Sequence, residues 1–293
     1  MRATLDTATW RKLSRSPSRH KALALNLYFR DCWEDALAIL GSSAAETLRG
    51  YALLIFKPES VVGRRITPAL DWLMEHHFSP VAFAPVTHTR HTMINLWKYS
   101  RWTPAMPDWI QLAGLMHTST DTLLVILRDE EQEVDRDACA RLVRLKGSAI
   151  SQQRNRSHLR EALRPPSEIF NFVHSSDEPA DLVREVGICL DRPHRRQLLQ
   201  TLITYEKNRH LVSKLGAEVA RLEAASAEHD FDFKRSLQRI QNTWPLDPDA
   251  RWRLEKANNG GPKLSWDELK GIVDLDAVED WDFISIACAV LDL

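Results

Sequence analysis

The chain has 293 residues, of which 44% are hydrophobic and 27% charged, and its formal net charge is −1. This composition is ordinary for a globular protein, and the small net charge gives no general attraction to nucleic acid. No apolar run approaches the roughly 18 residues that a membrane span needs, and the first residues lack the apolar core of a signal peptide. The four cysteines form no CxxC pair, so neither a zinc site nor a disulfide framework is indicated. These features predict a cytoplasmic protein with free thiols that binds neither nucleic acid nor a membrane.

Residues 1–49 are expected to form an N-terminal extension. Residues 1–17 are polar and basic, which predicts a loose tail. From Ser18 to Leu40 apolar side chains recur every three or four residues, the pattern of one amphipathic helix. A Gly-Ser-Ser sequence ends this predicted helix.

Residues 50–192 alternate between strand and helix patterns. Short apolar runs predict four strands, at Tyr51–Phe56, Ser79–Val86, Thr122–Leu127 and Ile169–Val173. Helical spacing predicts helices at Thr67–His77, Thr89–Tyr99, Asp108–Met116, Cys139–Lys146 and Pro179–Leu190. Apart from two inserted helices, the order is β-α-β-β-α-β. It predicts an α/β (α+β) protein with a ferredoxin-like, four-stranded antiparallel sheet.

Residues 193–293 are expected to form a C-terminal helical region. An apolar stripe runs through Arg195–Glu223, and a second one runs from Phe233 to Trp244. Ser265-Trp266-Asp267-Glu268 has the pattern of a capping box that begins another helix. The last stretch, Trp281–Leu293, is mostly apolar and is predicted to be buried. Nothing in this region indicates a function.

One short sequence, Asn171-Phe172-Val173-His174-Ser175-Ser176-Asp177, joins the last predicted strand to a helix that begins near Pro179. A helix N-terminus attracts anions through its free N–H groups and its dipole. The pattern Asn-x-x-His-x-Ser-Asp resembles the active-site signature of nucleoside diphosphate kinases, whose histidine carries a phosphoryl group from a nucleoside triphosphate to a nucleoside diphosphate. Two further stretches resemble that family, Lys57-Pro58-Glu59 its Lys-Pro-Asp and Leu159-Arg160-Glu161 its Ile-Arg-Gly. The resemblance covers about residues 50–192.

The resemblance implies a phosphotransferase that uses ATP or another nucleoside triphosphate, with Mg²⁺ bound to the nucleotide and no metal site made by the protein. It implies that His174 is the nucleophile and that Glu185, eleven residues later, orients its ring directly or through Ser176. The residues implied to bind the nucleotide are Lys57, Trp97, Arg144, Arg160 and Asn171, with Trp102 and Trp109 as further candidates for stacking on the base. Each assignment has a plainer alternative: a structural histidine, a solvated basic face, and core packing of the tryptophans.

The sequence departs from the family's pattern around the histidine. Ser175 replaces a small Gly or Ala, Glu178 follows the aspartate, and Phe170 stands where an arginine usually precedes the asparagine. The Arg-Pro loop that helps hold the family's hexamers is not evident, although Thr103-Pro104 is nearby. These departures leave room for an acceptor other than an ordinary nucleoside diphosphate, such as a specialised small molecule or a peptide.

Two alternatives to phosphoryl transfer stay open. One is nucleotidyl transfer to a small molecule or peptide, and the other is a non-catalytic nucleotide-binding or interaction module. The apolar stripes of the added helices must be buried, most simply on the kinase-like domain of the same chain. Covering those surfaces would block the family's usual hexamer, so we expect a monomer or a homodimer.

Overall fold

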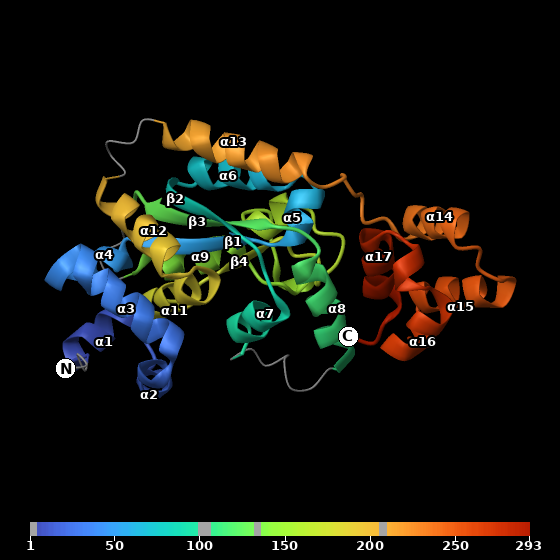
Figure 1. The fold of residues 1–293 in the computed structure, drawn as a ribbon, viewed down its shortest axis with the longest axis horizontal. Coiled ribbons are helices and arrows are strands. Elements are labelled where there is room, and N and C mark those ends of the chain that lie inside the picture. The colour runs from blue at the N-terminus through green and yellow to red at the C-terminus, as the bar shows by residue number, and fades with distance from the viewer. Residues whose placement is uncertain (1–4, 99–106, 132–135, 205–209) are drawn as a thin grey trace.

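The computed structural model describes residues 5–98, 107–131, 136–204 and 210–293. Its centre is a four-stranded antiparallel sheet with the strand order β2-β3-β1-β4 (Figure 1). The strands are β1 (Tyr51–Phe56), β2 (Phe78–Val86), β3 (Thr122–Asp129) and β4 (Val173–Ser175). Two interlocked split βαβ units produce this order, so the predicted ferredoxin-like fold class is confirmed.

Strand β1 is the central strand, and all six of its residues are buried. It pairs with β3 from Tyr51↔Arg128 to Phe56↔Leu123, which explains its unbroken apolar sequence. On its other side Ile55 pairs with His174 of β4, a strand of only three residues at the sheet edge. Because side chains alternate along a strand, the neighbours of His174 on β4 point to the opposite face of the sheet.

The predicted strand Ile169–Val173 is displaced in the structure, where β4 begins at Val173. The backbone of Phe172 has φ 63°, in the left-handed region that L-residues rarely occupy. A regular strand cannot contain such a residue, so pairing with β1 starts only after it. The apolar residues that precede Phe172 therefore belong to a turn and not to the sheet.

The remaining elements are helices, in larger number than the sequence pattern predicted. In the first 192 residues they are α1 (Thr7–Leu13), α2 (Pro17–Leu25), α3 (Leu27–Leu40), α4 (Ala44–Arg49), α5 (Pro58–Val62), α6 (Ile66–Glu75), α7 (Arg90–Leu96), α8 (Pro107–Thr118), α9 (Ala138–Lys146), α10 (Leu159–Ala162) and α11 (Pro179–Cys189). After them come α12 (Arg192–Thr204), α13 (Leu211–Ala224), α14 (Phe233–Thr243), α15 (Pro248–Asn258), α16 (Trp266–Ile272) and α17 (Asp280–Val290).

The N-terminal extension is more ordered than predicted. Residues 7–13 form helix α1, which buries Trp10 and Leu13, so this part is not a loose tail. The single helix expected between Ser18 and Leu40 is divided at Asn26, whose side chain accepts a hydrogen bond from the N–H of Phe29 and caps α3. The predicted buried face of α3 is present.

A buried carboxylate, Glu178, fixes this extension to the sheet domain. Its oxygens accept hydrogen bonds from the Ser14 hydroxyl at 2.7 Å and from the backbone N–H of Arg15 at 3.0 Å. Arg19 donates to Glu178 at 2.7 Å and to Asp181 at 2.6 Å. Charge-assisted hydrogen bonds of this kind are the strong ones, and they hold the extension against the N-terminal end of α11.

The C-terminal region divides into two parts (Figure 1). Helix α12 packs against α3 and β2, and α13 lies beside α6 and β2, so both cover the sheet domain. Helices α14–α17 gather at one end of the molecule, where α17 contacts α8. Buried leucines line the first part, namely Leu198, Leu202, Leu215 and Leu222. In the second part Trp244 and Trp252 are exposed, unlike most of the apolar residues around them.

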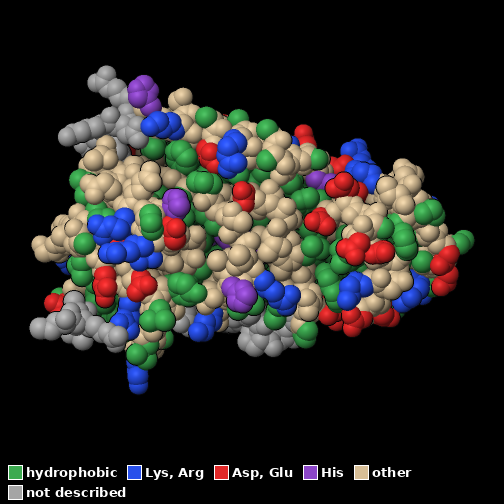
Figure 2. Space-filling model, viewed as in Figure 1, with side chains coloured by type: hydrophobic (Ala, Val, Ile, Leu, Met, Phe, Trp, Pro, Cys, Tyr) green, Lys and Arg blue, Asp and Glu red, His purple; other side chains and the backbone are tan. Residues whose placement is uncertain are grey.

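The surface shows no single-signed charge field over the face seen in Figure 2, where acidic and basic side chains are interspersed. This mixture accords with the net charge of −1. Within the described ranges no helix has both the length and the apolar character required to cross a membrane.

We expect the fragment that ends at Asp191 to aggregate or to melt well below the full chain. It would expose the surfaces of α3, α6 and β2 that α12 and α13 bury. Each kcal/mol lost lowers the melting temperature of a domain this size by roughly 2–4 °C, and losing several buried leucines predicts a drop of at least about 10 °C. Differential scanning calorimetry measures it. The matched control is a fragment that ends at Ala225, which keeps α12 and α13 and should melt closer to the full chain. An Asp191 fragment of unchanged stability would make the C-terminal region a separate domain.

Candidate functional site

The turn before His174 is held by the residues that follow β1. The side chain of Glu59 accepts a hydrogen bond from the N–H of Phe172 at 3.2 Å. The carbonyl oxygen of Phe172 accepts from the N–H of Lys57 at 2.9 Å and from the hydroxyl of Ser60. Both backbone groups of a left-handed residue are therefore paired, which offsets the roughly 1–3 kcal/mol that such a conformation costs. We call these contacts the Phe172 clamp.

The clamp sets His174 opposite a carboxylate of α11. Nε2 of His174 lies 3.1 Å from Oε2 of Glu185, but their alignment does not make a hydrogen bond. The same carboxylate accepts from the Ser176 hydroxyl at 2.6 Å and from Arg184 at 3.3 Å. Burial opposes ionisation of Glu185, but the nearby His174 ring and these donors hold its pKa below the usual value. Nδ1 of His174 makes no hydrogen bond to any described residue, so its lone pair is open to a reaction partner.

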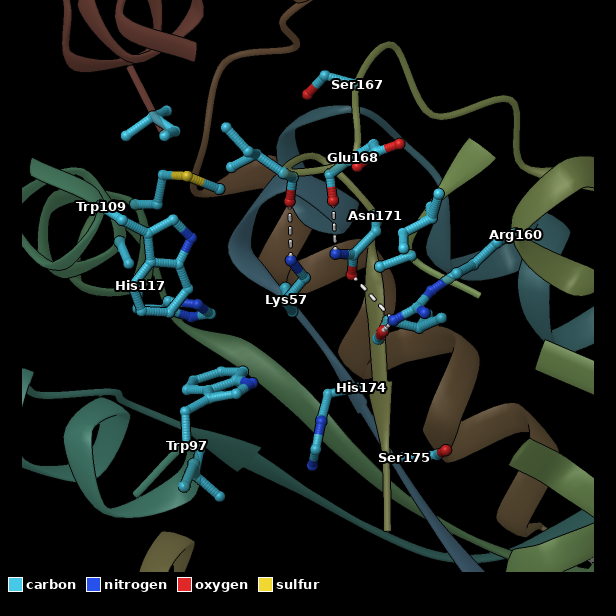
Figure 3. Close-up of a pocket in the computed structure, with 18 of the residues that line it drawn as sticks. Lys57, Trp97, Trp109, His117, Arg160, Ser167, Glu168, Asn171, His174 and Ser175 are labelled. Atoms are coloured by element: carbon cyan, nitrogen blue, oxygen red, sulfur yellow. Dashed lines mark hydrogen bonds between the residues drawn. The ribbon is translucent and has the colours of Figure 1, made fainter. Parts of the chain in front are cut away.

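Lys57 lies beside this histidine in the wall of a cavity (Figure 3). Its ammonium group contacts Oε1 of Glu59 at 2.6 Å and donates to the carbonyl oxygen of Ile169 at 3.1 Å. Burial lowers the pKa of Lys57, and the Glu59 carboxylate opposes that shift. The Glu59 carboxylate therefore already neutralises the charge of Lys57 within the protein. The same carboxylate accepts the hydrogen bond from Phe172 in the Phe172 clamp.

Arg160 and Asn171 are brought together near Lys57 (Figure 3). Arg160 donates to the Asn171 side chain at 3.1 Å, to the carbonyl oxygen of Val173 at 2.7 Å and to that of Gly147 at 3.0 Å. Its Nε is buried and has no hydrogen-bond partner among the described residues. Burial lowers the pKa of Arg160 to about 10. Arg160 therefore organises the backbone around the site and retains one unused donor.

The structure describes two of the three tryptophans that were candidates for stacking on the base. The ring centroid of Trp97 lies 5.5 Å from that of His174, edge to face, and 4.5 Å from that of His117. Trp109 lines the same cavity from α8. Trp102 and Thr103-Pro104 lie outside the described residues. Figure 3 shows Trp97 and Trp109 on the same side of the cavity as His117.

Arg144 is not brought to the site. It lies on the exposed face of α9 and is not among the described residues that line the cavity. The helical period explains this position, because the residue two positions later, Lys146, is on the buried side of the same helix. A basic side chain does reach the cavity from α9, but it is a different one from that implied by the resemblance.

The cavity has a volume of about 920 Å³, enough for a nucleotide-sized molecule. One part of its wall is aromatic and apolar, with Leu96, Trp97, Trp109, Met116 and Ile150. Three basic side chains, Lys57, Lys146 and Arg160, also line the cavity, together with His174. The C-terminal region also contributes, through Lys263, Cys288 and Leu291. The site therefore contains residues from outside the predicted 50–192 domain.

His117 and Lys146 line the cavity without having been assigned to the site from the sequence. His117 is buried in the last turn of α8, and burial holds its pKa well below the usual value, so the ring is neutral. Its Nδ1 has no hydrogen-bond partner in the described parts of the chain. The only sequence signal was a polar residue at an otherwise apolar helical position, which is common in ordinary cores. In the sequence Lys146 is one of several basic residues between positions 141 and 164, and nothing local distinguishes it from the others.

Two residues that depart from the resembled signature, Phe170 and Glu178, attach the extensions to the sheet domain. Phe170 is buried and stacks on Phe231 of the C-terminal region, with ring centroids 4.8 Å apart. Phe231 also lies against Gly63, where a Cβ atom would come within 2.7 Å of its ring. Glu178 holds the N-terminal extension, as described above. Both residues flank His174 in sequence, so the extensions are anchored on either side of the histidine.

The described residues contain no group of three or more His, Cys, Asp or Glu side chains that could hold a metal ion. No protein-family model and no curated protein sequence matches the chain. Among solved structures, the chain is similar to the nucleoside diphosphate kinase of Aquifex aeolicus, with a TM-score of 0.40 and 18% identity over 48% of this chain and 94% of that one. It is also similar to the apo nucleoside diphosphate kinase of Encephalitozoon cuniculi, with a TM-score of 0.40 and 16% identity over 47% of this chain and 87% of that one. Likeness this low assigns neither a family nor an activity.

We expect Glu59→Ala to destabilise the protein by about 3–5 kcal/mol, because it leaves the buried Lys57 ammonium without its counter-charge. It also removes the acceptor for the N–H of Phe172. Urea denaturation of the full chain gives the change in unfolding free energy. The control is Glu46→Ala, which breaks the exposed Lys12–Glu46 pair and should cost no more than about 1 kcal/mol. Equal losses in the two variants would contradict the Phe172 clamp.

Proposed function

We propose that the protein is a nucleoside triphosphate-dependent phosphotransferase that acts through a phospho-His174 intermediate. The observation that carries the proposal is the environment of the His174 ring. One nitrogen faces a buried carboxylate at 3.1 Å, and the other is free of hydrogen bonds to described residues and belongs to a cavity-lining side chain. A histidine nucleophile needs this asymmetry, because a proton held on one nitrogen leaves a lone pair on the other. The signature sequence around it adds further support.

In the proposed reaction Nδ1 of His174 attacks the γ-phosphorus of the nucleotide. The bond from that phosphorus to the bridging oxygen breaks, and the nucleoside diphosphate leaves with the electron pair. In the second step an acceptor oxygen attacks the phosphohistidine, its proton is released, and neutral His174 is restored. Glu185 keeps the proton on Nε2 in both steps, and catalytic hydrogen bonds of this kind often tighten only with substrate bound. Mg²⁺ enters with the triphosphate, as in phosphoryl transfer generally.

The cavity wall favours a specialised acceptor over an ordinary nucleoside diphosphate. Lys263, Cys288 and Leu291 approach the site from the C-terminal region. Phe231 of the same region stacks on Phe170, three residues before Val173, where pairing with β1 begins. Side chains from an added region therefore bound the space into which an acceptor must fit, so we infer that they select it. A small molecule or the end of a peptide suits a volume of about 920 Å³.

The direct test is a single-turnover reaction of the full chain with γ-labelled nucleoside triphosphates and Mg²⁺. We expect acid-labile, base-stable label on the protein, which is the chemistry of a phosphorus–nitrogen bond, and none on His174→Ala. Release of pyrophosphate instead of a nucleoside diphosphate would replace the proposal with nucleotidyl transfer. Nucleotide binding without either product, across the common nucleoside triphosphates, would favour a non-catalytic binding module.

A second prediction concerns Glu185. We expect Glu185→Gln to slow phosphorylation by about 10²–10⁴-fold, the usual contribution of acid–base assistance, while nucleotide affinity changes little. Rapid-quench labelling gives the rate, and equilibrium binding of an unlabelled, non-hydrolysable nucleotide gives the affinity. Glu168→Gln is the matched control, because among the described residues this cavity-lining carboxylate accepts a hydrogen bond only from the backbone N–H of Ser151. An unchanged rate in Glu185→Gln would remove Glu185 from the mechanism.

A further inference from the structure

Lys146 is a buried cation that the proposed phosphoryl transfer does not use. It ends α9, lines the cavity and is only 7% exposed. Its ammonium group donates one hydrogen bond, to the hydroxyl of Ser175 at 2.7 Å. An ammonium has three donors, so two of its hydrogens have no acceptor in the described parts of the chain. A buried charge with unused donors is costly unless a ligand completes it.

No carboxylate lies within ion-pair distance of Lys146 among the described residues. Arg160, 8% exposed, is likewise without a carboxylate partner there and is close enough to repel the charge of Lys146. Arg154 adds a third cation, whose guanidinium donates to the carbonyl oxygens of Ser148 and Ala149. Three positive side chains thus lie at the short segment after α9, and no described carboxylate is within ion-pair distance of them.

Lys146 approaches β4 from the face opposite the His174 side chain. Lys146 contacts Ser175, which points away from His174 because the two are consecutive in a strand (Figure 3). Lys57, by contrast, is neutralised by Glu59 at 2.6 Å. Among the described residues, the positive charge without a carboxylate partner therefore lies on Lys146 and Arg160 rather than on Lys57.

We propose that Lys146, Ser175 and Arg160 form an oxyanion-binding subsite that takes the phosphate group of a small molecule. Lys146 supplies the unused donors, Arg160 adds a second positive charge to the cavity wall, and the Ser175 hydroxyl supplies a further polar contact. A tetrahedral dianion matches two or three cationic donors that converge from different directions. That this molecule is the phosphoryl acceptor rests on the proposed function, but the subsite itself does not.

The charge state of Lys146 gives the subsite a pH dependence. Burial lowers the pKa of Lys146 to about 7, Arg160 lowers it further, and Asp177, Glu185 and Cys139 oppose the shift. A bound dianion stabilises the ammonium form and raises this pKa. Anion binding should therefore be strong below about pH 7 and should weaken as the pH rises and the amine loses its proton.

The test is the melting temperature of the full chain in sulfate against chloride at equal ionic strength, without nucleotide. Sulfate stays a dianion over the whole range, so a change in its effect reports on the protein. We expect a sulfate-induced rise near pH 6 that falls by at least half near pH 9, and that Lys146→Met abolishes. Lys270→Met is the control, because this lysine of α16 pairs with Asp267 on the surface, is not among the described residues that line the cavity, and should leave the response as in the wild type.

A second measurement tests the proposal on the wild type, in case the Lys146→Met variant does not fold. In the wild type with ¹³C-labelled lysine, sulfate should raise the pKa of the Lys146 ammonium measured by NMR. An unchanged pKa, or a sulfate response that survives in Lys146→Met, would overturn the proposal. A response lost in Lys57→Met but kept in Lys146→Met would assign the anion to the histidine face instead. Glycerol phosphate in place of sulfate should act in the same way, whereas a response to acetate alone would exclude a phosphate ligand.

Discussion

The conformation of Phe172 is the constraint on which the rest of the site depends. A bulky residue in the left-handed region persists only where its surroundings hold it. Here its N–H and carbonyl are both occupied by the corner that follows β1, through Glu59, Lys57 and Ser60. The turn ends the irregular approach to β4 and places His174 in register with Ile55. The geometry of the histidine is thus decided by residues more than a hundred positions earlier.

The same region serves as the anchorage for both extensions. Phe170 stacks on Phe231, and Glu178 receives hydrogen bonds from Ser14, Arg15 and Arg19. These two positions are among those at which the sequence departs from the signature it resembles. Phe170 makes a hydrophobic contact and Glu178 supplies a buried carboxylate, and both bind the extensions at positions that would otherwise face solvent. The departures are therefore explained by packing, and they leave the histidine and its carboxylate in place.

The basic side chains that line the cavity differ in the groups they pair with. Lys57 is committed to Glu59, while Arg19 and Arg184 are paired with Asp181 and Glu185 on α11. Within the described parts of the chain, Lys146 and Arg160 donate hydrogen bonds only to neutral groups. At short distance in a buried setting, pairing with a carboxylate largely cancels the field that a ligand would feel. The number of basic residues in the sequence therefore overstates the positive potential of the site, and their partners decide where it lies.

The sequence by itself determined the sheet, because a fully buried central strand needs an unbroken apolar run and β1 has one from Tyr51 to Phe56. It also determined the capping box at Ser265 and the termination of α9 at Gly147, since these depend on neighbouring residues. Local pattern could not find the start of β4, because the turn at Phe172 is imposed by Glu59 and Ser60 from another segment. Nor could it tell Arg144 from Lys146, two basic residues of one helix. Only the packing of α9 turned one outward and the other into the cavity, because burial depends on what covers each face of a helix.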